Sequence, residues 1–127
     1  MRTFKTKPFA RFARREGIGD RALYDAVRRA REGMFDADPG GGVIKQRIAR
    51  KGGGRSGGFR TIVVFRRGEL AFFVHGFAKS DRNDLRRMEP SGLRSLANEY
   101  LALNAAGLAA AQAVGAIIEV ECDDQAI

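Results

Sequence analysis

The sequence predicts an α+β domain in which a small, largely antiparallel sheet carries two N-terminal helices on one face and is followed by a C-terminal helical extension. Apolar residues recur at helical spacing in the first third of the chain, and apolar and polar residues alternate through its middle. Glycine-containing turns separate the alternating segments. We expect one domain over residues 1–104 and an Ala-rich, acidic extension over residues 105–127.

The N-terminal part is predicted to be a strand followed by two helices. Residues 2–5 form the strand, Pro8 suits the first turn of the first helix, and Gly17 ends that helix. Asp20 is expected to cap a second helix that runs to about Met34. The buried stripe of this second helix is predicted to be Leu23, Val27, Ala30 and Met34.

The middle of the chain is predicted to hold three strands, over residues 43–50, 59–66 and 69–77. The sequence DPGGG at residues 38–42 is expected to be a loop. The sequence KGGGRSGG at residues 51–58 lacks the spacing of a nucleotide-binding phosphate loop and precedes a strand, which disfavours a nucleoside triphosphate site.

The C-terminal third is predicted to be mainly helical. A short helix is expected at residues 84–88, Pro90 interrupts it, and Ser91 can cap the next helix. An Ala-rich helix to about Val114 and a strand over residues 117–122 complete the predicted order.

Positive charge is concentrated in one stretch. Residues 39–68 contain eight basic residues and no Asp or Glu, and the bases are Lys45, Arg47, Arg50, Lys51, Arg55, Arg60, Arg66 and Arg67. Residues 1–104 carry a net charge of +12, from 23 bases and 11 acids, whereas the remainder carries −4. Such asymmetry predicts that the body binds RNA or DNA; the alternative is that the arginines only keep a small protein soluble.

Other functional classes are disfavoured. The single cysteine, Cys122, excludes a disulfide framework and a cysteine-based zinc site. No acidic cluster adjoins the basic stretch, so neither a metal nor another cofactor is expected. The chain opens with no signal peptide, and residues 105–118 are too short to span a membrane, so we expect a cytoplasmic protein.

Strand register predicts where the chemistry lies. A hairpin turn centred between Arg67 and Gly68 pairs Arg60 with His75, and only a three-residue loop would shift this register. The core face is then expected to hold Phe59, Val63, Phe65, Leu70, Phe72 and Val74. The opposite face is expected to hold Arg60, Arg66, Phe73, His75 and Phe77, joined by Lys45 and Arg47 from the neighbouring strand.

An arginine beside a histidine suits RNA cleavage by the RNA's own 2′-hydroxyl. Arg60 can stabilise charge on the phosphate, and His75 can transfer protons. Phe73 or Phe77 can stack on bases. A structural role for the histidine and a catalytic one both remain open at this stage.

The segment from Lys51 to Asp84 resembles toxins of the RelE/ParE superfamily, nearest to its HigB-like branch. The similar pieces are Gly58-Phe-Arg60 at the start of one strand and FFVHGFAKSDR in its hairpin partner, and the order of elements is similar over about residues 1–100. The resemblance implies a RelE-like fold, a type II toxin–antitoxin pair with a cognate antitoxin, and metal-independent cutting of mRNA on the ribosome.

The resemblance also implies site residues. Arg60 matches the strand arginine on the scissile phosphate, and Lys79 or Arg82 matches a basic position after the last hairpin strand. A catalytic C-terminal tyrosine has no match, because Tyr100 is predicted to face the core, and this favours His75 for proton transfer.

The combined expectation is an endoribonuclease that inhibits translation. Its predicted catalytic residues are Arg60, His75 and Lys79, and its predicted RNA-binding residues are Lys45, Arg47, Lys51, Arg55, Arg66, Phe77 and Arg82. The alternatives are a ParE-like DNA gyrase inhibitor without nuclease chemistry and a non-catalytic nucleic-acid-binding module. The acidic tail, Glu119–Asp124, is expected either to fold back on the basic face or to form an edge strand.

Overall fold

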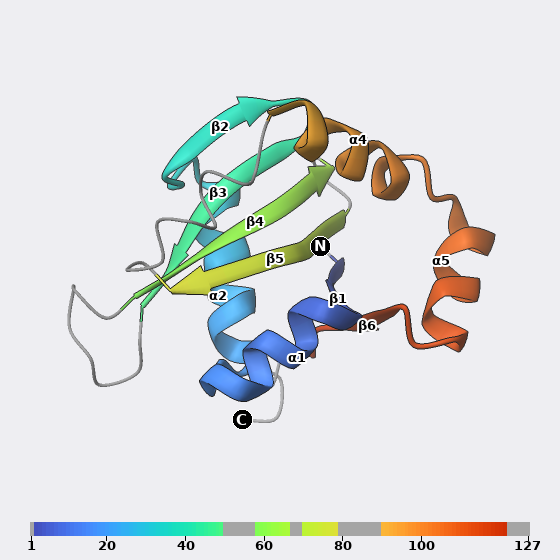
Figure 1. Ribbon diagram of the computed structural model, residues 1–127, viewed down its shortest axis with the longest axis horizontal. Coiled ribbons are helices and arrows are strands. Elements are labelled where there is room, and N and C mark those ends of the chain that lie inside the picture. Colours follow the sequence, from blue (N-terminus) through green and yellow to red (C-terminus); the bar gives the residue numbers. More distant parts are fainter. Residues whose placement is uncertain (1, 50–57, 67–69, 79–89, 122–127) are drawn as a thin grey trace.

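The computed structural model describes residues 2–49, 58–66, 70–78 and 90–121 (Figure 1). Its elements in chain order are β1 (Arg2–Thr6), α1 (Lys7–Glu16), α2 (Asp20–Arg31), β2 (Ala37–Gly40), β3 (Val43–Ile48), β4 (Phe59–Arg66), β5 (Leu70–Ala78), α4 (Pro90–Leu101), α5 (Ala105–Ala113) and β6 (Ile117–Glu119). Within these residues six strands form one sheet in the order β2-β3-β4-β5-β1-β6. Only the β1–β5 pair is parallel among the described strands, which confirms the predicted α+β class with a largely antiparallel sheet.

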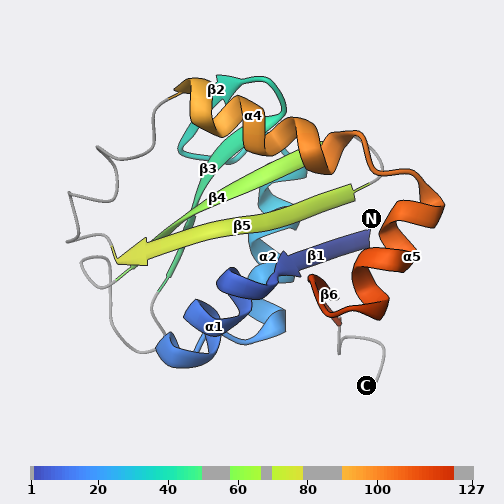
Figure 2. The same cartoon turned by 45° about the vertical axis from the view of Figure 1, so that its right-hand side comes forward.

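Helices cover both faces of the sheet (Figure 2). Helices α1 and α2 pack on one face, as predicted, and their core residues there include Phe9, Phe12, Leu23 and Val27. Helices α4 and α5 pack on the other face through Leu93, Ala97 and Leu108. Because the central strands are buried on both sides, they carry apolar residues on both faces, unlike a sheet with one solvent-exposed face.

The first helix begins and ends as predicted, whereas the second differs from prediction at both ends. In α1 the Thr6 hydroxyl accepts a hydrogen bond from the Phe9 amide at 3.3 Å, and the helix ends at Gly17, which has a φ of 72°. The N-cap of α2 is Gly19 instead of Asp20, which occupies the first turn. This helix ends at Arg31, and Met34, predicted to be buried, is 50% exposed.

The predicted loop at residues 38–42 is wrong in part, because β2 extends to Gly40 and pairs with β3. Gly41 and Gly42 connect the two strands with φ values of 68° and 83°. Positive φ at both central residues is required in two-residue hairpin turns of type I′. The sequence DPGGG therefore contains the last three residues of β2 and the two residues of the turn. A Cβ on Gly42 would lie 2.9 Å from a methyl group of Leu101, so the turn packs directly on α4.

The predicted register of the β4–β5 hairpin is also wrong. Arg66 pairs with Leu70 and Val63 with Phe73, so three residues connect the paired strand ends and the register moves by one residue. A second shift follows at a β-bulge, beyond which Ile62 pairs with His75.

Val74 is the extra residue of this bulge, since neither neighbouring pair includes it. Beyond it Arg60 pairs with Phe77 and not with His75. The two shifts cancel in their effect on side-chain direction, so Arg60 and His75 share a face although they are not directly paired.

The composition of the two faces changes accordingly. Residues Phe59, Val63 and Phe65 pack toward α1 and α2, whereas Leu70, Phe72 and Val74 belong to the core beneath α4 and α5. Phe73, expected on the open face, is fully buried with its ring centroid 5.1 Å from that of Phe9.

Gly76 is the residue that lets the bulged strand fit against α1. A Cβ built there would lie 2.6 Å from Cδ2 of Phe12 and 3.0 Å from Cε2 of Phe9. Both neighbours are rigid aromatic rings in the core, so they cannot withdraw as the end of a flexible side chain can.

The C-terminal residues complete the far edge of the sheet. Strand β6 pairs antiparallel with β1, so the strand predicted over residues 117–122 is confirmed for Ile117–Glu119. Of the acidic tail only Glu119 belongs to this edge strand, and residues 122–124 lie outside the described residues. Two hydrogen bonds join Glu119 to the Arg2 guanidinium at 3.0 and 3.1 Å. The predicted helix at residues 84–88 lies outside the described residues, and no described helix is long and apolar enough to cross a membrane.

Replacing Gly76 by alanine is expected to destabilise the protein by about 1–3 kcal/mol, because the added methyl group overpacks the ring cluster. The matched control is Gly92→Ala in α4, where a Cβ meets nothing within 4 Å. That control should be neutral or stabilising by roughly 0.5–1 kcal/mol, since glycine is a poor helix former. Urea unfolding measures both, and equal stability of the two variants would contradict this packing.

Removing the charge of Glu119 is expected to flatten the acid limb of the stability curve. The hydrogen bond from Arg2 lowers the pKa of the Glu119 carboxyl, so its contribution is present above the unfolded-state pKa and is lost as the pH falls through the lowered value. Because the pair is partly exposed, Glu119→Gln should cost at most about 1 kcal/mol at pH 7 and nothing in strong acid. Thermal melts against pH measure this, with Glu121→Gln as the control.

Candidate nucleic-acid interface

Strands β3, β4 and β5 place three cationic side chains and one histidine on one face of the sheet. The register pairs Lys45 with Ile62, Arg47 with Arg60, and Ile62 with His75. Directly paired residues point to the same side of a sheet, so Lys45 and Arg47 join Arg60 on its face, as the alternation predicted. We call Lys45, Arg47, Arg60 and His75 the basic face.

Two arginines of this face lie directly opposite each other. Arg47 and Arg60 are cross-strand partners, an arrangement of like charges that is destabilising unless an anion offsets it. Asp36 is the acid near Arg47, with its carboxylate 3.9 Å from the Arg47 Nε. Among the described residues no group forms a hydrogen bond or ion pair with the side chain of Arg60. This arrangement suits an external anion, for which guanidinium groups supply several donors in a fixed geometry.

The bulge at Val74 determines where His75 points. Its ring is partly exposed and lies 5.9 Å, between centroids, from the ring of Phe77. Arg60 is its diagonal neighbour, a relation that brings side chains within about 7–8 Å of each other. The Nε2 atom of His75 is buried and has no hydrogen-bond partner. Buried polar atoms are rarely left without a partner, and a catalytic role is one of the explanations for such an atom.

Two residues predicted to bind RNA are engaged elsewhere. Phe77 is only 2% exposed, so its ring offers no face to a nucleobase. The Arg66 guanidinium lies at the opposite end of β4 and donates hydrogen bonds to the carbonyls of Leu101 and Leu103, at 3.0 and 3.1 Å. Leu101 is the last residue of α4 and Leu103 lies just beyond it, so Arg66 satisfies carbonyls at the helix terminus.

Tyr100 faces the core, as predicted. Its ring centroid lies 5.1 Å from that of Phe72. Burial raises the pKa of the Tyr100 hydroxyl, which disfavours the phenolate that a general base would need.

The other predicted site residues, Lys51, Arg55, Lys79 and Arg82, lie outside the described residues. Within the described part of the chain no three His, Cys, Asp or Glu side chains gather as a metal-binding group.

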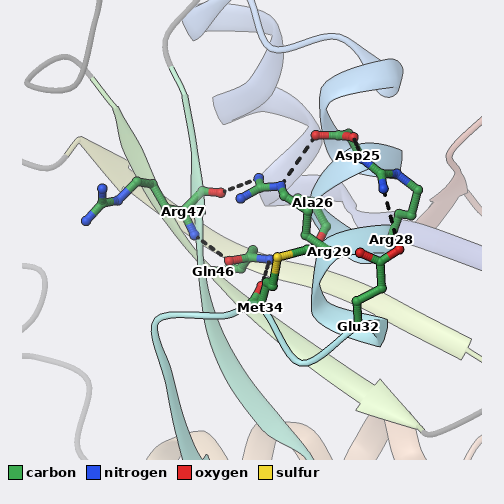
Figure 3. A network of polar contacts seen from close by, with 8 residues as sticks. All are labelled: Asp25, Ala26, Arg28, Arg29, Glu32, Met34, Gln46 and Arg47. Atoms are coloured by element: carbon green, nitrogen blue, oxygen red, sulfur yellow. Dashed lines mark hydrogen bonds and ion pairs between the residues drawn. The ribbon is translucent and has the colours of Figure 1, made fainter.

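The sequence interpretation missed a polar network beside the basic face (Figure 3). Gln46 is a polar residue at a core-facing position between Ile44 and Ile48, and its side chain is only 2% exposed. Its side chain and that of Arg29 both bond to the backbone of Arg47. A polar residue in the apolar register of a buried strand is the signal that would have identified it.

The comparisons with known proteins agree with this fold. Residues 1–120 match the family model described as RelE toxin of the RelE/RelB toxin–antitoxin system. A search of curated proteins finds no match to the chain. Because the family model spans all the described elements, from β1 to β6, the chain belongs to the RelE toxin family.

Proposed function

We propose that this toxin is a metal-independent endoribonuclease of the HigB-like branch that cuts mRNA on the ribosome and thereby inhibits translation. The observation that carries the proposal is the basic face, where Arg47 and Arg60 oppose each other beside a histidine with an unpartnered ring nitrogen. Membership of a toxin–antitoxin family gives the protein a cognate antitoxin as its partner.

Binding begins with the phosphate. A phosphodiester placed between Arg47 and Arg60 offsets the repulsion between the two cations and supplies acceptors for the Arg60 guanidinium, which has none among the described residues. Lys45 lies on the same face two residues from Arg47 along β3, so it is placed for an adjacent phosphate of the RNA backbone. Lys51, Arg55 and Arg82 are proposed to extend these backbone contacts.

The chemistry is attack by the 2′-hydroxyl on the neighbouring phosphorus. A bond forms between the 2′-oxygen and phosphorus, negative charge accumulates on the non-bridging oxygens, and the bond to the 5′-oxygen breaks. The guanidinium of Arg60, with Lys79 as a second cation, stabilises that charge as it develops. The products are a 2′,3′-cyclic phosphate and a free 5′-hydroxyl.

His75 is the proposed proton-transfer group. The reaction needs one proton removed from the 2′-hydroxyl and one delivered to the 5′-oxygen. Imidazole can perform either transfer, and the partly exposed ring lies on the same face as Arg60. Because Nε2 is buried in the free chain, transfer through that atom requires that RNA binding expose it.

Replacing the two central residues tests the proposal. Arg60→Ala is expected to lower the cleavage rate by about 10²–10³-fold, as loss of a transition-state donor does. His75→Ala is expected to lower it by roughly 10²–10⁴-fold, the usual range for an acid–base group. The measurement is mapping of transcript 5′ ends after brief induction, together with growth arrest.

The matched control is Arg11→Ala, which removes the same charge from the exposed side of α1, on the face of the sheet opposite to Arg60. It should leave cleavage within about twofold, since single surface charges contribute little. Undiminished growth arrest by both Arg60→Ala and His75→Ala would refute the nuclease assignment. Intact messages with broken chromosomes would instead identify a gyrase inhibitor.

A further inference from the structure

Strand β2 stops short of the basic face and leaves the outer edge of β3 open at Arg47. The last cross-strand pair joins Ala37 to Lys45, and the Asp36 amide donates to the Lys45 carbonyl at 2.9 Å. Backbone groups two residues apart in a strand point the same way, so the N–H and C=O of Arg47 also point to this edge. Strand β2 does not reach these two backbone groups. Leaving them without hydrogen bonds in a half-buried position would cost free energy of folding.

Two side chains replace the missing strand (Figure 3). The Oε1 atom of Gln46 accepts a hydrogen bond from the Arg47 amide at 3.1 Å. The guanidinium of Arg29, which comes from α2, donates to the Arg47 carbonyl at 2.9 Å. Both backbone groups of Arg47 that face the edge are therefore held by side chains.

The two side chains are themselves anchored. The Nε2 atom of Gln46 donates to the carbonyls of Ala26 and Met34 at 2.8 and 2.9 Å, so its amide bridges β3 to α2 and the segment after it. The Nε atom of Arg29 lies 3.4 Å from the carboxylate of Asp25. A hydrogen bond from Arg28 lowers the pKa of that carboxyl, which favours the ionised form that pairs with Arg29.

Any hydrogen-bond donor could satisfy the Arg47 carbonyl at this edge, so edge closure alone does not explain why an arginine of α2 does so. The direction of the Arg47 side chain suggests what else the contact achieves. Figure 3 shows this side chain extending away from α2. Its register partner on the basic face is Arg60. A long side chain contributes most to phosphate binding when its backbone is already fixed, because less freedom is then lost on binding.

We infer that Arg29 and Gln46 are positioning residues that act through Arg47, holding its guanidinium opposite Arg60 so that the two together take one phosphate of the RNA. This inference rests on the proposed function, since it assigns Arg47 to the phosphate. It adds that α2 sets the geometry of the site from the opposite face of the sheet.

The test is a double-mutant cycle between Arg29 and Arg47. The probe is a short fluorescein-labelled RNA with 2′-O-methyl groups, which cannot be cleaved, and its affinity is read by anisotropy at fixed salt. Arg47→Ala should weaken binding about tenfold or more, as loss of a charge-assisted contact does. Arg29→Met should weaken it about three- to fivefold, and this effect should vanish in the Arg47→Ala background, because coupled residues are not additive.

Arg28 is unsuitable as a control, because it bonds to Asp25, the carboxylate that anchors Arg29. The matched control is therefore Arg31→Met, since Arg31 is exposed and lies in the last turn of the same helix. Its substitution should weaken binding by less than about twofold. Arg29→Lys, which keeps a donor and the charge, should restore most of the affinity, and melting temperatures verify that every variant is folded.

The outcomes separate the two proposals. If Arg47→Ala weakens binding but Arg29→Met weakens it equally in both backgrounds, or no more than Arg31→Met does, the positioning role is overturned and the phosphate site stands. If Arg47→Ala and Arg60→Ala both leave RNA affinity and mRNA cleavage unchanged, the proposed phosphate site fails, and the positioning role fails with it.

Discussion

The basic face depends on one extra residue in β5. Without the bulge at Val74, the register at the turn would continue and His75 would pair with Thr61, on the side packed against α1. The bulge turns His75 and Phe77 to the opposite side, where Arg60 lies. It also turns Gly76 toward the rings of Phe9 and Phe12, at a position with no room for a side chain. The direction of the basic face and the packing of the core are therefore linked within four consecutive residues, VHGF.

The two ends of the same sheet face serve different purposes. At one end α4 covers apolar residues such as Phe72, and Arg66 bonds to carbonyls at the C-terminal end of that helix. At the other end the sheet keeps Arg47 and Arg60 opposed on a partly exposed surface. Like charges placed this way cost stability in the free protein, and an anion bound between them would offset that cost. Such an arrangement is typical of a site built for a ligand rather than for folding.

The edges of the sheet are also treated differently. At the β1 edge the C-terminal residues add β6, so the backbone groups of β1 pair with another strand. At the β3 edge the strand β2 ends early, and Gln46 and Arg29 bond to the Arg47 backbone instead. The two side chains hold the backbone of Arg47 alone, whereas a strand would pair with several residues. They also connect this edge of the sheet to α2. The basic face is consequently supported by an element that lies on the other side of the sheet.

The sequence by itself determined the α+β class, both N-terminal helices and the acid-free basic strands, because hydrophobic period and charge are local properties. It also placed Arg60 and His75 on one face, although through a register that was wrong. Only the tertiary structure decided the three-residue connection after Arg66 and the compensating bulge at Val74, since strand pairing is a long-range choice that packing against α1 and α4 settles. For the same reason the partners of Gln46 and Arg29 could be found only in the folded chain.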